Sequence, residues 1–279
     1  MTNTTSSSHA KVILKPPLKW PGGKRWLAPH FRRLFPFYKE HRWVEPFCGG
    51  LGLTLSLLPD EALLSDINPH LINFYIQIRK GLKLPVERFH NEAETYYKLR
   101  DAFNDLISSQ KTQTKKAAWL FYYLNRTGFN GLCRFNKDGK FNVPFGRYKT
   151  INYRSEFSEL RSLFRRWEFR CCHYEALTGD ITEDDIVYAD PPYDVEFTKY
   201  FQDGFTFRDQ EHLADWLAHL PARTVIISNQ ATDRICNLYQ RLGFTIKILD
   251  GPRRISCNGD RTPAKEVLGW IRKEGGVTV

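Results

Sequence analysis

The 279-residue chain lacks several patterns that would place it in common functional classes. No apolar run reaches the roughly 20 residues that a membrane-spanning helix needs. The six cysteines form no C-x-x-C and the eight histidines no H-E-x-x-H, so no metal site is predicted. The chain has neither a G-x-G-x-x-G nor a G-x-x-x-x-G-K-[ST] segment. That absence disfavours the binding of a dinucleotide or of nucleoside-triphosphate phosphates.

Cysteine usage and the N-terminus favour a cytoplasmic protein. The vicinal pair Cys171 and Cys172 is unsuited to an ordinary disulfide, so the cysteines are predicted to be free thiols in a reducing compartment. The first residues are polar, which predicts a disordered tail over residues 1–10 and argues against a signal peptide. A hydrophobic content of 42% gives enough apolar surface for one large domain or for a core with an insert.

The positive charge of the chain is concentrated in its middle. Between His70 and Arg154 there are 16 Lys and Arg against 6 Asp and Glu, an excess that equals the net charge of +10 for the whole chain. Such a segment is typical of proteins that bind a polyanion, and a merely solvated basic face is the alternative. It shows no continuous basic amphipathic helix of the kind that binds membranes. Aromatic residues are interleaved with these charges at Phe121, Tyr122, Tyr123, Phe129, Phe135, Phe141, Phe145 and Tyr148. The combination favours nucleic acid as the partner.

The most informative motif is Asp190-Pro191-Pro192-Tyr193. It follows the apolar run 185–189, which predicts a buried strand that ends in a rigid turn bearing a carboxylate and an aromatic ring. The amino group of a nucleobase is a weak nucleophile because its lone pair is delocalised into the ring. A carboxylate and a backbone carbonyl can accept its two N–H bonds, and an aromatic ring can stack on the base. By itself the tetrapeptide is also compatible with a purely structural turn.

Two earlier segments predict a nucleoside-binding pocket. Residues 43–52 form a short strand pattern followed by a loop with Gly49, Gly50 and Gly52, where missing side chains let the backbone approach a ligand. The next apolar stretch ends in Asp66, and an acid at the end of the second strand of a doubly wound sheet accepts hydrogen bonds from ribose hydroxyls. A nucleoside cofactor without a diphosphate, such as S-adenosylmethionine, fits this pair better than NAD does. Taken singly, Glu45 or Asp66 is more typical of a solvated acid at a strand end.

A third segment lies near the N-terminus at residues 18–24. Its proline and two glycines predict a turn, in which Trp20 can cover an apolar ligand and Lys24 can meet a carboxylate. On its own this segment is a plain loop before a helix.

The alternation of strand and helix patterns predicts an α/β fold. Helical spacing at 70–80, 93–108 and 117–124 makes the middle segment mainly helical, and Asn136 to Lys140 is typical of a hairpin turn. Later strands are expected near 168–172, 186–189, 224–228, 244–249 and 267–271, with helices near 156–167 and 209–219. This order indicates an open, mostly parallel sheet with its site at the carboxyl ends of the strands. We expect one α/β domain over 11–69 and 155–274, interrupted over 70–154 by the basic insert that is predicted to bind nucleic acid.

Together these segments resemble the Dam-type DNA adenine-N6 methyltransferases, the D12 class in the α-group of amino-methyltransferases. The resemblance spans residues 18–271, and its most restrictive part is Leu124-Asn-Arg-Thr-Gly-Phe-Asn-Gly-Leu-Cys-Arg134 with Gly139-Lys-Phe-Asn-Val-Pro-Phe-Gly-Arg-Tyr148. It implies a Rossmann-like methyltransferase sheet with an inserted, mainly helical DNA-recognition domain that carries a β-hairpin. It also implies site-specific, adenine-specific methylation of double-stranded DNA from S-adenosylmethionine, without a metal.

The resemblance assigns roles in the pocket. Asp190 would polarise the amino group of a flipped adenine, the Pro191 carbonyl would hold the other N–H, and Tyr193 would stack on the base. The implied catalytic residues are Asp190, Pro191, Pro192 and Tyr193. The implied cofactor site comprises Trp20, Lys24, Glu45, Phe47, Gly49, Gly50, Gly52, Asp66 and Asp190.

The implied DNA contacts lie mainly in the insert. Phe129 would wedge into the base stack, Asn130 would fill the space left by the adenine, and Arg134 would read a guanine in the major groove. The family's target GATC is the expected sequence, in which two apolar residues would meet a thymine methyl and two other residues would meet the first guanine. The full implied set is Lys19, Asn125, Arg126, Phe129, Asn130, Leu132, Arg134, Asn142, Pro144, Arg147 and Tyr148. In that set Leu132 and Pro144 meet the thymine, and Lys19 and Tyr148 meet the guanine.

Other expectations concern the surroundings of the enzyme. The arginine-rich loop at 252–261 is expected to touch DNA phosphates, or else is a solvated connection. Two alternatives remain open: a DNA-binding regulator without catalysis, and an amino-methyltransferase that acts on another nucleic acid or on a protein amide. We expect a nucleoid-associated monomer, and a cognate restriction endonuclease is a candidate partner.

Overall fold

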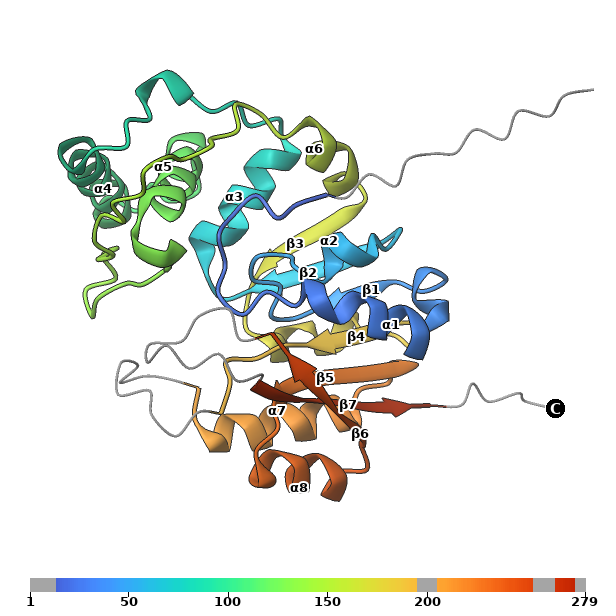
Figure 1. The fold of residues 1–279 in the computed structure, drawn as a ribbon. Coiled ribbons are helices and arrows are strands. Elements are labelled where there is room, and N and C mark those ends of the chain that lie inside the picture. The colour runs from blue at the N-terminus through green and yellow to red at the C-terminus, as the bar shows by residue number, and fades with distance from the viewer. Residues whose placement is uncertain (1–13, 195–204, 253–263, 274–279) are drawn as a thin grey trace, which may run out of the picture.

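The computed structural model describes residues 14–194, 205–252 and 264–273 (Figure 1). The tail expected over 1–10 and nearly all of the loop at 252–261 lie outside the described residues. Within the described part of the chain, no helix is long and apolar enough to cross a membrane.

The core of the molecule is a seven-stranded sheet in the order β3-β2-β1-β4-β5-β7-β6. The strands are β1 (Trp43–Glu45), β2 (Ala62–Asp66), β3 (Trp167–Cys171), β4 (Ile186–Ala189), β5 (Thr224–Gln230), β6 (Thr245–Gly251) and β7 (Ala264–Arg272). The first five strands in this order are parallel, whereas β7 is antiparallel to both β5 and β6. The predicted α/β fold with a mostly parallel sheet is therefore confirmed.

Helices cover both faces of this sheet. The α-helices are α1 (Ala28–Leu34), α2 (Thr54–Leu57), α3 (Pro69–Arg79), α4 (Ala93–Ser108), α5 (Lys115–Thr127), α6 (Ser158–Phe164), α7 (Phe207–His219) and α8 (Asp233–Arg241). Short 3₁₀ turns are η1 (Arg25–Leu27), η2 (Pro36–Lys39), η3 (Val86–Arg88), η4 (Phe129–Gly131) and η5 (Tyr174–Asp180). The helix expected near 156–167 is shorter at both ends, and the one near 209–219 begins two residues earlier, at Phe207, which follows the capping residue Thr206.

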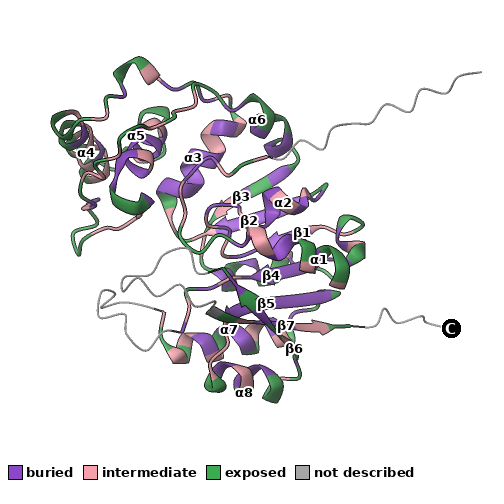
Figure 2. Ribbon diagram, viewed as in Figure 1, coloured by how far each residue is buried: buried purple, intermediate pink, exposed green. Residues whose placement is uncertain are grey.

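Alternate residues of the central strands enter two separate hydrophobic clusters. In β4, Ile186 and Tyr188 pack with α1, α2 and α3, while Val187 and Ala189 pack with α7 and α8. Successive side chains of a strand point to opposite faces, which produces this division. Figure 2 shows the central strands buried along their length between the two helical layers. Because helices cover both faces of the sheet, a site is expected at the carboxyl ends of the strands, which the helices leave accessible.

The basic middle segment forms α3, α4 and α5, which stand together beside the β3 end of the sheet (Figure 1). All three helices expected from the apolar spacing are confirmed, and α5 extends three residues beyond the expected end at Leu124. The ring of Tyr75 in α3 lies 5.3 Å from that of Phe169 in β3, and α3 also packs against α5. One hydrophobic cluster therefore runs from the sheet into the insert. The domain boundary near residue 69 stays a prediction.

The expected hairpin after α5 is present in reduced form. Phe135 and Phe141 form an isolated antiparallel bridge, and the N–H of Asn136 donates to the carbonyl of Lys140 at 2.9 Å. The turn is closed by the side chain of Asn136, which accepts from the N–H groups of Asp138 and Lys140. The flanking segments form only isolated bridges and single backbone hydrogen bonds, such as that from Asn142 N–H to the Arg134 carbonyl, rather than an extended ladder.

Candidate active site

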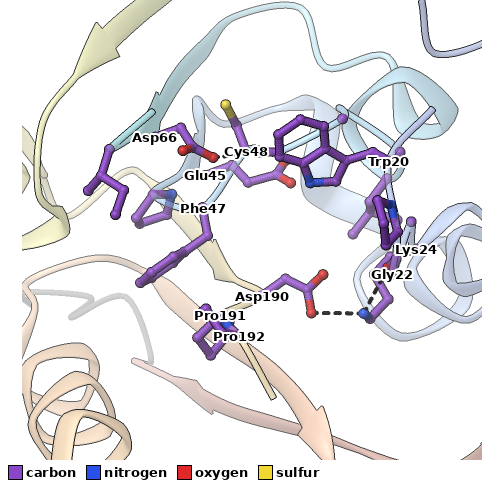
Figure 3. A pocket seen from close by; sticks show the side chains of 18 of the residues that line it. Trp20, Gly22, Lys24, Glu45, Phe47, Cys48, Asp66, Asp190, Pro191 and Pro192 are labelled. Carbon is purple, nitrogen blue, oxygen red and sulfur yellow. Dashed lines mark hydrogen bonds and ion pairs between the residues drawn. The ribbon is translucent and has the colours of Figure 1, made fainter. Parts of the chain in front are cut away.

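A cavity of about 490 Å³ opens at the carboxyl ends of β1, β2 and β4 (Figure 3). Parallel strands bring their C-terminal residues to one edge of a sheet, so segments distant in sequence meet there. The lining contains every residue predicted for the cofactor and for catalysis: Trp20, Lys24, Glu45, Phe47, Gly49, Gly50, Gly52, Asp66, Asp190, Pro191, Pro192 and Tyr193. The N-terminal turn, which is uninformative alone, closes one side of this cavity.

Asp190 follows β4 directly, and one of its carboxylate oxygens has two partners. Its Oδ1 lies 3.0 Å from Nζ of Lys24 and accepts a 2.8 Å hydrogen bond from the hydroxyl of Ser228. That serine, on the neighbouring strand β5, also shares a 2.8 Å hydrogen bond with the hydroxyl of Tyr188. Oδ2 of Asp190 has no hydrogen-bond partner among the described residues. The carboxylate is thus oriented by two supports and keeps one oxygen for a ligand.

Buried amides hold the turn that follows Asp190. The Pro192 carbonyl accepts a 2.7 Å hydrogen bond from Nε2 of Gln210 in α7. Asn229 of β5 donates to Gln210 at 2.9 Å and accepts from the backbone N–H of Asp194 at 3.2 Å. Because both amides are fully buried, these hydrogen bonds fix the backbone on which Tyr193 stands.

Two further acids line the pocket: Glu45 is buried and Asp66 is half-buried. The carboxylate of Asp66 accepts hydrogen bonds from the N–H groups of Gly49 at 3.1 Å and Asn68 at 2.9 Å. Burial raises the pKa of Asp66, although these two hydrogen bonds act in the opposite direction. Burial also raises the pKa of Glu45 to about 8, although Thr54 and Trp43 both donate to its Oε2. The pocket is therefore an acidic cavity in which desolvation opposes full ionisation.

The glycine-rich loop packs against Trp20. A Cβ added to Gly49 would lie 2.7 Å from Nε1 of Trp20, and one added to Gly50 would lie 2.4 Å from its Cβ. The sequence predicted that these glycines make room for a ligand. In the structure the indole of Trp20 lies where their side chains would be, and Gly52 similarly makes room for the backbone at Lys24. The glycines thus allow the N-terminal turn to close onto the loop, and their expected role beside the cofactor stays a prediction.

Sequence reasoning missed several lining residues: Pro21, Cys48, Ile67, His173, Tyr174 and Phe205. Ile67 directly follows Asp66, and His173 and Tyr174 follow the end of β3, so applying the strand-end rule to all three strands would have found them. Phe205 lies just before α7 and carries no such signal. Glu266 on β7 contacts the pocket residues Tyr193 and Lys24 and was also missed.

The predicted DNA-binding residues fall into an anchored group and an exposed group. Lys19 is anchored: its backbone exchanges hydrogen bonds with the side chain of Asn125, and its Nζ donates to the Arg126 carbonyl at 2.8 Å. Nζ also lies 3.5 Å from the centroid of the Tyr148 ring. Burial and the nearby Arg126 lower the pKa of Lys19 to about 8. Asn125 is itself buried and clamps the carbonyl of Gly131, so its expected role as a direct contact is corrected to a positioning one.

The exposed group surrounds η4 and the hairpin. Phe129 is 47% exposed, and Asn130 beside it adopts a left-handed φ of 53°. The Arg134 side chain donates through Nε to Oδ1 of Asn142 at 2.8 Å, which orients the guanidinium. Pro144 and Arg147 are exposed, while Leu132, Arg126, Asn142 and Tyr148 are half-buried. The structure brings these residues onto one segment of the insert, but it does not test what they bind.

The strand-end pocket and the basic insert together match a known family. The model of the D12 class N6 adenine-specific DNA methyltransferases matches residues 20–255. The chain belongs to this family. It is 35% identical to the retron Ec67 DNA adenine methylase of Escherichia coli over 261 residues, covering 90% of this chain and 89% of that protein. It is 36% identical to a DNA adenine methylase of Vibrio cholerae, covering 90% of this chain and 94% of the relative.

A third relative is the DNA adenine methylase of Escherichia coli K12, which is 35% identical and covers 94% of this chain and 96% of its own. Among solved structures, the 23S rRNA methyltransferase ErmE aligns with a TM-score of 0.41 and 9% identity, over 89% of this chain and 68% of the other. That likeness is too distant to inform the site. Among the described residues no cluster of three or more potential ligands could hold a metal ion.

Proposed function

We propose that this member of the D12 class transfers a methyl group from S-adenosylmethionine to the N6 amino group of an adenine that is flipped out of double-stranded DNA. The observation that carries this proposal is the geometry of Asp190. Its Oδ1 is held by Lys24 and Ser228, while Oδ2 is open to the cavity side of a rigid turn that also bears Tyr193. An amino group delivered there would meet a fixed acceptor and an aromatic ring.

The pocket fits the proposed cofactor in size and in charge. Its volume of about 490 Å³ lies within the range of small-molecule sites. Asp66 lies at the end of β2, where it suits ribose hydroxyls, and the carboxylate of Asp190 supplies negative charge for a cationic ligand. When bound, S-adenosylmethionine supplies an electrophilic sulfonium methyl group. The aromatic and apolar lining, including Phe47, excludes water from the place where the methyl group would be transferred.

Asp190 acts by holding and polarising the amino group, and not through the strength of its carboxylate as a base. A hydrogen bond from N6 to its Oδ2 draws electron density toward the nitrogen and aims the lone pair, and the Pro191 carbonyl accepts the second N–H. Tyr193 stacks on the base and sets its plane. Holding the reacting atoms in line supplies much of the acceleration, because effective molarities of aligned groups are large.

The insert would recognise the duplex and support base flipping. Phe129 has an exposed ring and would enter the base stack, and Asn130 would follow it into the vacated space. Arg134, oriented by Asn142, suits the O6 and N7 atoms of a guanine. Lys19 and Tyr148 lie together and suit the first guanine of GATC, while Leu132 and Pro144 suit a thymine methyl. A palindrome can be methylated one strand at a time, so a monomer suffices.

The decisive experiment is transfer of a labelled methyl group from S-adenosylmethionine to two duplexes that differ only in GATC against a scrambled tetramer. Digestion to nucleosides identifies the product. We expect N6-methyladenine in the GATC duplex alone. Label in both duplexes would contradict the proposed readout by Arg134 and leave the chemistry intact. Tight duplex binding with no label in either would favour a regulator without catalysis.

A further inference from the structure

Glu266 is a second carboxylate beside Asp190, and no sequence motif points to it. It lies on β7, 73 residues beyond Tyr193, and its side chain is only 13% exposed. Its Oε2 accepts a 2.6 Å hydrogen bond from the hydroxyl of Tyr193 and lies 3.9 Å from Nζ of Lys24. Both of these partners line the cavity.

The side chain of Tyr193 is held both at its hydroxyl group and at its ring. The hydroxyl end of the ring is tied to Glu266, and Nζ of Lys24 lies 4.4 Å from the ring centroid. Burial, followed by the charges of Asp190 and Glu266, raises the pKa of Tyr193, so the phenol keeps its proton and acts as the donor. A ring tied at its far end loses most of the freedom of its two side-chain torsions.

The strand pairing places Glu266 at this point. In the register of the sheet, Glu266 lies opposite Gln230 of β5 and opposite Leu249 of β6. A Cβ on Gly251 of β6 would lie 2.8 Å from Oε1 of Glu266, so the absence of a side chain there leaves room for the carboxylate. The same β5–β7 pair carries Ser228, which supports Asp190. One pair of strands therefore supplies a support for each of the two key side chains of the turn.

We propose that Glu266 is a positioning residue of the methyl-transfer site, which accepts the hydroxyl hydrogen bond of Tyr193 and so fixes the ring on which the target base stacks. This inference rests on the proposed function. Glu266 acts through Tyr193 and does not line the cavity, so its loss lowers kcat through misplacement of the base and leaves the KM for S-adenosylmethionine nearly unchanged.

The test compares Glu266→Ala with Glu266→Gln in the duplex methylation assay. We expect kcat to fall about tenfold or more in Glu266→Ala, since small misplacements are costly in an active site. Glu266→Gln keeps an acceptor oxygen and should recover kcat to within about threefold of the wild type. Asp250→Asn, an exposed carboxylate on β6 that pairs with Lys265, is the matched control and should retain full activity. Thermal unfolding of each variant confirms that it is folded.

A double-variant comparison shows whether the effect runs through the hydroxyl. Glu266→Ala added to Tyr193→Phe should produce no further loss, because the hydrogen bond is already gone. Multiplicative losses, or equal losses in the Gln and Ala variants, would overturn the role of Glu266. If Glu266→Ala does not fold, Glu266→Gln and Tyr193→Phe decide: near-wild-type activity in the first and a fall in the second support the role, and the reverse contradicts it. An inactive wild-type protein would instead contradict the proposed function.

Discussion

The pocket and the insert differ first in charge. Around the pocket lie four carboxylates, Glu45, Asp66, Asp190 and Glu266, close to one buried cation, Lys24. The insert holds an excess of positive charge equal to that of the whole chain. An acidic cavity suits a cationic cofactor, and a basic surface suits a polyanion. The charges of the two regions therefore favour different ligands, although one hydrophobic cluster connects the regions.

The two regions also differ in how their residues are assembled. Pocket residues come from the ends of several strands and meet because the sheet is parallel. Apart from Lys19, the proposed DNA contacts are nearly contiguous between residues 125 and 148, and backbone conformation arranges them: Asn130, Gly131 and Arg147 all have positive φ. Chemistry at the pocket therefore depends on the global fold, whereas recognition depends mainly on local loop geometry. Substitutions in the two regions should therefore have separable effects.

The largest expected effect comes from Asp190→Ala. Removing the polarising carboxylate should lower kcat by about a hundredfold or more, as is typical when a group that stabilises the transition state is lost. Duplex affinity should stay near that of the wild type, because the insert is untouched. Methyl-transfer rates and a duplex-binding titration measure the two quantities. Equal loss of turnover and of DNA affinity would break the separation between pocket and insert.

Arg134→Ala tests the insert and leaves the pocket unchanged. Losing a bidentate contact to guanine should reduce the preference for GATC over the scrambled duplex by about tenfold to a hundredfold. Binding of S-adenosylmethionine should not change. Lys137→Ala, which removes the same charge from the exposed hairpin turn, is the control and should preserve the preference while weakening the salt dependence of binding. If both variants lost the preference for GATC equally, Arg134 would be a phosphate contact rather than a guanine contact.

Ser228→Ala sharpens the account of Asp190. Without its hydroxyl, Oδ1 of Asp190 keeps only Lys24 and the carboxylate gains freedom to rotate. We expect kcat to fall about threefold to tenfold, which corresponds to one hydrogen bond. Steady-state rates on the GATC duplex measure this, with Ser162→Ala on the exposed side of α6 as the control. An unchanged kcat would show that Lys24 alone orients the carboxylate.

A last prediction concerns stability rather than turnover and involves Glu45. Its folded-state pKa of about 8 lies above the ordinary value of 4.5, so between these pH values the unfolded chain releases a proton that the folded chain keeps. This group therefore stabilises the fold at low pH, and that contribution is lost as pH rises from 5 to 8. In Glu45→Gln the unfolding free energy should fall less between pH 5 and pH 8.5, as measured by urea unfolding. Glu61→Gln, an exposed control, should keep the wild-type slope, and identical slopes in all three proteins would refute the assignment.

Much of the pocket was predictable because each element carried a local signal. The apolar run before Asp190, the glycine loop and the acid of Asp66 each mark a strand end, and parallel topology brings strand ends together. The helices of the insert were predictable from apolar spacing, which reflects the period of the helix itself. The hairpin was less predictable, because the extent of its pairing depends on how its side chains pack against the rest of the insert.

Residue type and local periodicity establish the chemistry available at the site: Asp190 with its Pro-Pro-Tyr turn, the acid of Asp66, and a middle segment that carries the excess charge. These features need no partner elsewhere in the chain. In contrast, the packing of Trp20 against the glycines, the support of Asp190 by Ser228 and the hydrogen bond from Tyr193 to Glu266 come from the folded arrangement of the strands. Each of these contacts joins segments far apart in sequence, and their distances depend on the order and register of the strands.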